Sequence, residues 1–315
     1  MVRQKLAAGS LAVFTIAGTL AGACAGAEQG RGAAAKSPFP VTVRAANGKV
    51  TLQKRPVRIV SLSPTATEDL FAIGAGKQVV AVDDQSNYPA RAPRTKLSGY
   101  TPNSEAVAGY NPDLVVASSD ANGLLRALKR LRIPVLLEPS AGNLDGAYDQ
   151  IRQLGLATGH RRGAAALVAR MRAQIAKAVR SVPKPAKPLS VYHELSPDYF
   201  SATSKTFIGQ AYRLFGLRDI ADAADKTGSK YPQLSGEYIV AQNPNLIVLA
   251  DTKCCHQTPA TVAARPGWGQ ISAVKHGDVV GVSDDIASRW GPRIVNFIRL
   301  IAVKVKAAEA ATARG

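Results

Sequence analysis

The sequence predicts an α/β fold of two Rossmann-like lobes, in which parallel sheets are flanked by helices and one long helix joins the lobes. Three observations support this prediction. Short apolar runs alternate with helical patterns, one helix-turn-strand pattern occurs twice, and a long amphipathic segment separates the two halves. Apolar runs without polar alternation are typical of strands buried on both faces, and their alternation with helices predicts a parallel sheet.

The repeated pattern occupies Ser104–Ala117 in the first half of the chain and Ser235–Ala250 in the second half. In each copy a glutamate (Glu105, Glu237) is followed seven positions later by the proline of an Asn-Pro pair. The residue before a proline is disfavoured in the helical region, so Asn-Pro predicts the end of a short helix. The apolar run that closes each copy predicts a buried strand. Two copies are too few for a solenoid and indicate one lobe built twice.

Residues 1–23 are typical of an export signal. A basic start with Arg3 and Lys5 precedes an apolar stretch over Leu6–Leu20, and small residues follow it. That stretch is too short, and too often interrupted by glycine and threonine, for a membrane-spanning helix. We therefore expect the mature protein to act outside the cytoplasm.

Cys24 stands where a lipoprotein signal peptidase would leave a lipidated cysteine. The match to that cleavage pattern is imperfect, because Leu20 lies four residues before Cys24 instead of three. Simple cleavage after Ala23 or Ala27 is the alternative. We expect a lipoprotein on the outer face of the cytoplasmic membrane, or a periplasmic or secreted protein if Cys24 carries no lipid.

The remaining chain divides into a tether and two lobes. Residues 24–38 are rich in alanine and glycine and predict a flexible tether. We expect an N-terminal lobe over 39–160, an interlobe helix over 161–182 and a C-terminal lobe over 187–310. Asn47-Gly48 between two alternating runs predicts a hairpin at the start of the first lobe. Apolar residues recur every four positions in the interlobe segment, and the prolines after it predict its end.

The net charge of +18 is unusual for a globular chain of 315 residues. A nucleic-acid-binding protein would gather such charge with aromatic residues or in a known motif. Here lysine and arginine are scattered, and the densest groups, Arg126–Arg132 and His160–Arg172, indicate solvated helix faces. We therefore expect no nucleic-acid partner. Attraction to an anionic membrane surface or to an anionic ligand is the better use of the charge.

No motif in the sequence predicts catalysis. The chain lacks a Gly-x-Ser-x-Gly elbow, a glycine-rich phosphate loop ending in Lys-Ser/Thr and a His-Glu-x-x-His pair. His193-Glu194 stands at the end of a predicted strand, where such a pair is more often a polar loop contact than a general base. We expect a protein that is not an enzyme and has no cofactor. An extracytoplasmic hydrolase is the remote alternative.

The stretch Arg58–Glu68, with the sequence RIVSLSPTATE, combines a strand with the start of a helix. Its apolar residues 59–62 predict a buried strand. Thr65 and Glu68 have the spacing of a capping box, which predicts the helix N-terminus. The glycines at 74 and 76 end this helix, so they do not form a dinucleotide-binding fingerprint, in which glycines open a helix.

Arg58–Glu68, the following Ser86–Pro89, the doubled Glu-to-Pro pattern and Arg289–Arg293 (RWGPR) together resemble one family. This family comprises the substrate-binding proteins of ABC importers for cobalamin and ferric siderophores, and the resemblance covers nearly all of residues 38–308. It implies two α/β lobes joined by one long helix, with the ligand cleft between them. The implied partners are an ABC transporter permease with its ATPase and a small-molecule ligand, and we expect a monomer.

In this family two glutamates, one on each lobe, engage arginines of the permease. By motif position these residues are Glu105 and Glu237. An acidic residue at a helix start is also favoured by the helix dipole, which is the alternative explanation for both.

The resemblance further implies a ligand site lined by aromatic side chains, whose flat faces suit a rigid macrocycle. Tyr88 matches the tyrosine of the loop after the second strand, and Tyr100 and Tyr231 fall where cobalamin binders often carry tryptophan. For each of them, a loop tyrosine that merely covers the edge of the core is the alternative. The predicted ligand-binding residues are Tyr88, Tyr100, Ser118, Tyr199, Phe200, Tyr231, Lys253, Arg289 and Trp290.

We expect cobalamin or a related corrinoid as the ligand, although two positions depart from cobalamin binders. Ser118 replaces an aromatic residue, and the residue before Arg289 is not acidic. Arg289, with Lys253, would instead suit the oxygens of a ferric siderophore or the propionates of haem. A structural ion pair of Arg289 with Asp284 or Asp285 is a further alternative.

Cys254 and Cys255 are the only cysteines besides Cys24. In an oxidising compartment the adjacent pair predicts a vicinal disulfide. A reduced pair is the alternative, because disulfide geometry between neighbours is awkward. Adjacent cysteines poorly satisfy tetrahedral zinc, and the four histidines lack ligand spacing, so we expect no metal site.

Overall fold

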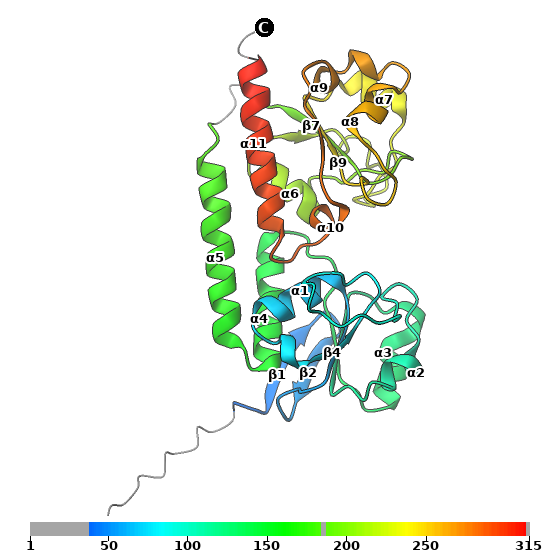
Figure 1. Ribbon diagram of the computed structural model, residues 1–315, viewed down its shortest axis with the longest axis vertical. Helices are drawn as coiled ribbons and strands as arrows, with labels where there is room; N and C mark the ends of the chain where they lie inside the picture. Colours follow the sequence, from blue (N-terminus) through cyan, green and yellow to red (C-terminus); the bar gives the residue numbers. More distant parts are fainter. Residues whose placement is uncertain (1–37, 184–186, 313–315) are drawn as a thin grey trace, which may run out of the picture. The chain divides into compact units, whose positions relative to one another are not determined.

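The computed structural model describes residues 38–183 and 187–312 (Figure 1). The predicted export signal, Cys24 and all but the last residue of the predicted tether lie outside the described residues. Within the described ranges, no helix is both long enough and apolar enough to span a bilayer.

The N-terminal lobe is a four-stranded parallel sheet preceded by a hairpin. The hairpin pairs β1 (Val41–Ala45) with β2 (Gly48–Leu52) in antiparallel fashion, as the Asn-Gly pair predicts. The sheet has the order β4-β3-β5-β6. Its strands are β3 (Ile59–Leu62), β4 (Val79–Val82), β5 (Leu114–Ala117) and β6 (Val135–Leu137).

Helices cover both faces of this sheet. Because successive side chains of a strand point to opposite faces, Leu114 and Val116 pack into one hydrophobic cluster, whereas Val115 and Ala117 pack into another. The first cluster includes α1 and α4, and the second includes α2 and α3. These helices are α1 (Pro64–Ala72), α2 (Ser104–Ala108), α3 (Leu124–Arg130) and α4 (Leu144–Thr158).

The start of α1 differs from the sequence prediction. Ser63 is the N-cap, and its Oγ accepts a hydrogen bond from the backbone N–H of Ala66. Pro64 follows at the first helical position, where its missing N–H costs nothing. The predicted capping box of Thr65 and Glu68 was therefore wrong, because the helix begins before Thr65. Glu68 is instead buried and pairs with arginines from the other end of the chain.

The predicted interlobe helix is α5 (Arg161–Arg180). Its buried face includes Leu167, Met171 and Ile175. This face packs against α4 of the first lobe and α11 (Ile294–Thr312) of the second. Helices α5 and α11 lie side by side in Figure 1. The expected two-lobed architecture with one long connecting helix is confirmed.

The C-terminal lobe repeats the arrangement of the first. Its sheet has the order β10-β9-β7-β8, and all paired strands are parallel. The strands are β7 (Ser190–Glu194), β8 (Arg218–Asp219), β9 (Leu246–Leu249) and β10 (Val279–Gly281). The helices besides α11 are α6 (Phe207–Arg213), α7 (Gly236–Gln242), α8 (Pro259–Ala263), α9 (Ser272–Lys275) and α10 (Asp284–Ala287).

Candidate functional site

All nine predicted ligand-binding residues follow the carboxyl ends of parallel strands. In the first lobe, Tyr88 and Tyr100 follow β4 and Ser118 follows β5. In open parallel sheets, ligands bind outside the carboxyl ends of the strands. In the second lobe, the residues after β7, β8, β9 and β10 are Tyr199, Phe200, Tyr231, Lys253, Arg289 and Trp290.

Four of the predicted aromatic side chains are exposed, which is unusual for such large apolar groups. The exposed fractions are 47% for Tyr88, 79% for Tyr100, 41% for Phe200 and 37% for Tyr231. Tyr231 also forms a side-chain hydrogen bond with Ser140, which follows β6 of the other lobe. Although its ring is exposed, partial desolvation of the titrating hydroxyl group raises the pKa of Tyr231.

Tyr199 is held in an aromatic cluster. Its ring stacks on Trp268 with 5.7 Å between the ring centroids. The Arg265 guanidinium lies over both rings, 5.3 Å from the centroid of Tyr199 and 4.5 Å from that of Trp268. Phe200, the neighbouring residue, is the more exposed of the two candidates.

Arg289 is buried in a network of protein partners. Its guanidinium donates hydrogen bonds to Glu68 (2.9 Å), to Asn87 (3.0 Å) and to the backbone oxygen of Gln85 (2.9 Å). It also pairs with Asp285 at 2.6 Å. The alternative of a structural ion pair between Arg289 and Asp285 is therefore confirmed. The hydrogen bonds of Arg289 also connect the two lobes.

Arg293 completes this network, which we call the Glu68 network: Glu68, Gln85, Asn87, Asp285, Arg289 and Arg293. Arg293 donates to both carboxylate oxygens of Glu68, at 2.9 and 2.6 Å. Its guanidinium lies 4.5 Å from the centroid of the Tyr88 ring. Burial opposes ionisation of Asp285, but hydrogen bonding by Asn87 and the charge of Arg289 outweigh it and lower the Asp285 pKa. The network thus fixes the loop that carries Tyr88.

The other predicted residues of the second lobe have different environments. Trp290 is half-buried, donates to Gln150 at 2.6 Å and packs against Phe207. Lys253 is exposed, with an ion pair to Asp285 at 3.3 Å. Ser118 of the first lobe is half-buried.

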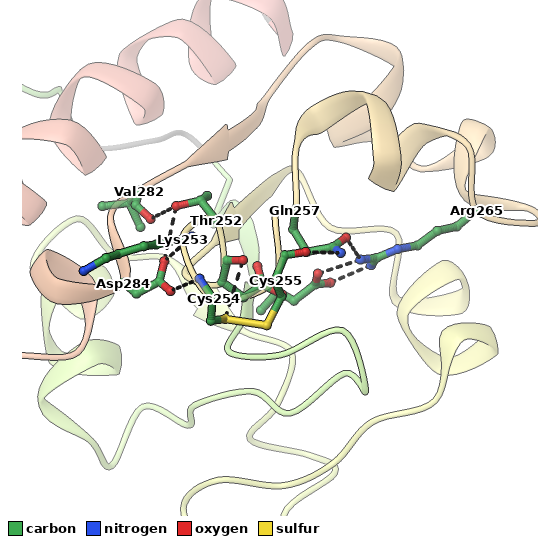
Figure 2. Close-up of a disulfide and its surroundings, with 10 residues drawn as sticks. Thr252, Lys253, Cys254, Cys255, Gln257, Arg265, Val282 and Asp284 are labelled. Carbon is green, nitrogen blue, oxygen red and sulfur yellow. Dashed lines mark hydrogen bonds and ion pairs between the residues drawn. A yellow bond between two sulfur atoms is a disulfide. The ribbon is translucent and has the colours of Figure 1, made fainter. Parts of the chain in front are cut away.

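A disulfide joins Cys254 and Cys255 in the turn after β9 (Figure 2). The Asp284 carboxylate accepts the backbone N–H groups of Lys253 (3.0 Å) and Cys254 (2.9 Å), so the turn is fastened to the start of α10. Thr252 adds hydrogen bonds to Asp284 and to the backbone oxygen of Val282. This fastening holds Lys253 at the carboxyl edge of the sheet.

A buried acidic cluster beneath this turn was not predicted. Glu194 accepts two hydrogen bonds from Arg265, both at 2.6 Å, and Tyr192 donates to it as well. Asp251 is fully buried beside the carboxylate of Glu194. Burial and the nearby charge of Glu194 raise the pKa of Asp251. The only sequence signal for this cluster is the place of two acids at the ends of apolar runs.

His193, which precedes Glu194, is fully buried beside the hydroxyl of Tyr212, with 2.6 Å between Nδ1 and the hydroxyl oxygen. Burial lowers the pKa of His193 to about 3. The imidazole is therefore neutral at physiological pH and cannot be reached by a substrate. No group of three or more His, Cys, Asp or Glu side chains within the described ranges is arranged to hold a metal ion.

Glu105 and Glu237 occupy equivalent positions in the two lobes. Each is the second residue of its helix, and the caps Asn103 and Ser235 accept hydrogen bonds from the third residue of that helix. Both glutamates are exposed, and neither forms an ion pair with a described residue. Hydrogen bonds from its own backbone and from Ser235 lower the pKa of Glu237.

Glu237 also borders a groove of about 900 Å³ beside Tyr199 and Trp268. The charged residues that line this groove are Asp198 and Glu237, both acidic. The groove therefore presents negative charge and an aromatic wall at one end of the repeated element.

The protein thus consists of two α/β lobes joined by one long helix, and exposed aromatic side chains lie where the strands of both sheets end. Residues 59–286 match the periplasmic binding protein family, and the chain belongs to this family.

Relatives and a solved structure agree with this assignment. The chain is 32% identical to an uncharacterised ABC transporter substrate-binding lipoprotein of Bacillus subtilis, over 96% of this chain and 98% of the relative. It is 35% identical to a cobalamin-binding protein of Halobacterium salinarum, over 82% of this chain and 72% of the relative. The structure of a periplasmic haem-binding protein from Roseiflexus sp. RS-1 has a TM-score of 0.71 at 23% identity, covering 80% of this chain and 98% of that one, and shows the shared fold.

Proposed function

We propose that this chain is the extracytoplasmic substrate-binding lipoprotein of an ABC importer, and that it captures cobalamin or a related corrinoid. The importer role is supported by the family and by similarity to the Bacillus subtilis lipoprotein over nearly the full length of both chains. The corrinoid is supported by similarity to the cobalamin-binding protein of Halobacterium salinarum. Lipidation at Cys24 would hold the protein on the outer face of the cytoplasmic membrane.

Exposed aromatic side chains at the carboxyl ends of strands in both lobes support a corrinoid ligand: Tyr88, Tyr100, Phe200 and Tyr231. A corrin is a large, rigid macrocycle, and aromatic side chains provide wide contact area for such a ligand at low entropic cost. The cost of exposing four such rings to water is recovered when a ligand covers them.

The hydrogen bonds that Arg289 already makes within the protein also favour a corrinoid over an anionic chelate as the ligand. An arginine that recognises carboxylate or hydroxamate oxygens needs free guanidinium donors. Both terminal nitrogens of Arg289 already donate to protein oxygens, and its side chain is 7% exposed. Among the predicted ligand-binding residues, this leaves Lys253 as the accessible cation.

A ferric siderophore or haem is the second candidate, and the position of Lys253 is the observation that favours it. The Lys253 side chain is 62% exposed and projects from the disulfide turn. Its ammonium group could pair with a propionate or with an oxygen of an iron chelate.

The proposed function is tested by titrating the protein with cyanocobalamin, a ferric hydroxamate siderophore and haem. Quenching of tyrosine and tryptophan fluorescence, corrected for absorbance and repeated by calorimetry, gives each affinity. We expect saturable submicromolar binding of cyanocobalamin only. Tight binding of the siderophore or haem, without binding of cyanocobalamin, would overturn the corrinoid assignment. Absence of binding to all three ligands would contradict the whole ligand proposal.

Variants then test the aromatic side chains. Tyr100→Ala removes an exposed ring, and we expect about tenfold weaker cyanocobalamin binding from the lost contact. Val303→Ala is the matched control, because Val303 is 63% exposed on α11, away from the strand ends. Equal affinities of Tyr100→Ala and Val303→Ala would remove Tyr100 from the site.

A further inference from the structure

A second groove lies on the N-terminal lobe, between β2 with the residues that follow it and α3, both labelled in Figure 1. We call it the basic groove, and its volume is about 920 Å³. Its floor is apolar and includes Val50, Leu52, Leu125 and Ile133. Its cationic residues are Lys49, Lys54, Arg55, Arg126, Lys129 and Arg132.

The charge of the basic groove is almost uncompensated. All six cationic residues are exposed, and none forms an ion pair with a described residue. Asp113 is the one acid in the lining, and its carboxylate already accepts the backbone N–H groups of Val57 (2.8 Å) and Arg58 (3.0 Å). The groove near Glu237 has the opposite character, since its charged lining residues are both acidic.

The basic groove lies at the opposite edge of the sheet from the predicted ligand-binding loops. Val57, Asp113 and Pro134 line it, and each stands one or two residues before the start of β3, β5 or β6. The predicted ligand-binding residues instead follow the carboxyl ends of the strands. The basic groove is therefore separate from the proposed ligand site.

The short segment between Cys24 and the N-terminal lobe supports a membrane as the surface that the basic groove binds. Val41, the first residue of β1, stands 17 positions after Cys24. Even a fully extended segment of that length spans at most about 60 Å. A lipid at Cys24 would therefore keep the start of the hairpin within about 60 Å of the bilayer surface, a distance that allows the basic groove to reach it.

We propose that the basic groove docks the N-terminal lobe onto a membrane surface rich in anionic phospholipid. Phosphate headgroups attract the cationic rim, and the apolar floor receives the glycerol region and upper acyl chains. Each lysine or arginine near an anionic bilayer strengthens binding by about fivefold. The biological role rests on the proposed location outside the cytoplasm, whereas the binding itself requires no lipid anchor.

The test uses residues 38–315, which form one compact unit with its own hydrophobic core. Flotation with vesicles of phosphatidylglycerol and phosphatidylcholine in equal parts is compared with flotation on pure phosphatidylcholine. We expect binding to the anionic vesicles only, and release by salt at about 0.5 M, because salt screens charges across the interface. Absence of binding to anionic vesicles would overturn the proposal.

Two double variants distinguish vesicle binding by the basic groove from attraction that depends only on the net charge of the protein. Arg126→Gln with Lys129→Gln removes two charges from the basic groove, and we expect about 30-fold weaker vesicle binding. Arg162→Gln with Arg170→Gln removes two exposed charges from α5 and should change binding less than about threefold. Equal losses in both pairs would assign the attraction to net charge and contradict a docking site.

Two further outcomes are informative. Binding of a short duplex DNA that is lost in the groove variant, without any vesicle binding, would assign the basic groove to nucleic acid and overturn the proposal. Cyanocobalamin affinity is measured on the same variants, and we expect it to be unchanged. A failure of ligand capture would therefore be distinguishable from a failure of membrane docking.

Discussion

Glu138 is a buried carboxyl group at the carboxyl end of β6. It is 4% exposed, and within the described residues no hydrogen bond to its Oε1 is found. Burial raises its pKa from the ordinary value of 4.5 to about 8. The folded protein therefore keeps a proton on Glu138 at pH values where the unfolded chain has released it.

This difference predicts that stability falls as pH rises from about 4.5 towards about 8. In that window one retained proton changes the free energy of unfolding by about 1.4 kcal/mol per pH unit. The Glu138→Gln variant carries no titrating group, so its loss of stability with rising pH should be smaller by about that slope. Denaturant unfolding at several pH values between about 5.5 and 7.5 measures the slope directly.

Glu237→Gln is the control for this experiment. Glu237 is exposed and its pKa is lowered, so it is ionised in both states across the same window. Its replacement should leave the slope unchanged. Equal slopes in wild type and Glu138→Gln would show that Glu138 is ionised in the folded protein.

Residues of this kind could not be predicted from the sequence. Glu138 and Asp251 follow apolar runs, which indicates a strand end but not whether the side chain faces water or protein. Glu68 shows the same limit, because its partners Arg289 and Arg293 lie more than 220 positions away. The sequence pattern around Glu68 predicted a local capping role. Its actual role, pairing with Arg289 and Arg293, depends on contacts between residues far apart in the chain, which no local pattern reveals.

At the scale of elements, the Glu68 network connects α1, the loop after β4 and the segment between α10 and α11. Glu68 is 2% exposed and Arg289 is 6% exposed. Removing one partner of a buried ion pair costs about 3–5 kcal/mol. Loss of Arg289 should fall at the lower end of this range, because Glu68 keeps Arg293 as a partner. The network should therefore contribute strongly to holding these elements together.

Arg289→Ala tests this contribution, and we expect the free energy of unfolding to fall by about 3 kcal/mol. Arg152→Ala is the comparison, because Arg152 pairs with Asp149 on an exposed helix face and should cost less than about 1 kcal/mol. Chemical denaturation of both variants gives the two values. A loss below about 1 kcal/mol for Arg289→Ala would contradict the buried network.

The repeated element was the most predictable part of the fold. Asn111 and Asn243 adopt left-handed backbone with φ of 49° and 46°, and a proline and a buried strand follow each of them. Local chemistry dictates this outcome, since asparagine tolerates the left-handed region and proline cannot continue the helix. The sequence therefore predicted both strands and the positions of Glu105 and Glu237 at the helix starts.

At the scale of the whole molecule, different surfaces carry different charges and side chains. Exposed aromatic rings lie where the strands end, the groove beside Glu237 is acidic, and the basic groove lies where the strands of the first lobe begin. A ligand, a permease and a membrane could thus be engaged at separate places. The composition alone showed the excess of positive charge, but it did not show that six cationic residues cluster in the basic groove.

We propose that the protein delivers its ligand by presenting Glu105 and Glu237, the equivalent exposed residues of the two lobes, to the permease. Ligand uptake by intact cells measures this delivery. Cells of the source organism would carry the Glu105→Ala, Glu237→Ala double variant in place of the native protein. The control is Asp145→Ala with Asp149→Ala, two exposed acids of α4 whose ion pairs are worth little.

We expect the glutamate variant to lose uptake of labelled cyanocobalamin, while the purified variant binds cyanocobalamin as tightly as wild type. The aspartate variant should transport normally. Normal uptake by the glutamate variant, or a loss of its ligand affinity in parallel with uptake, would contradict the proposed docking role.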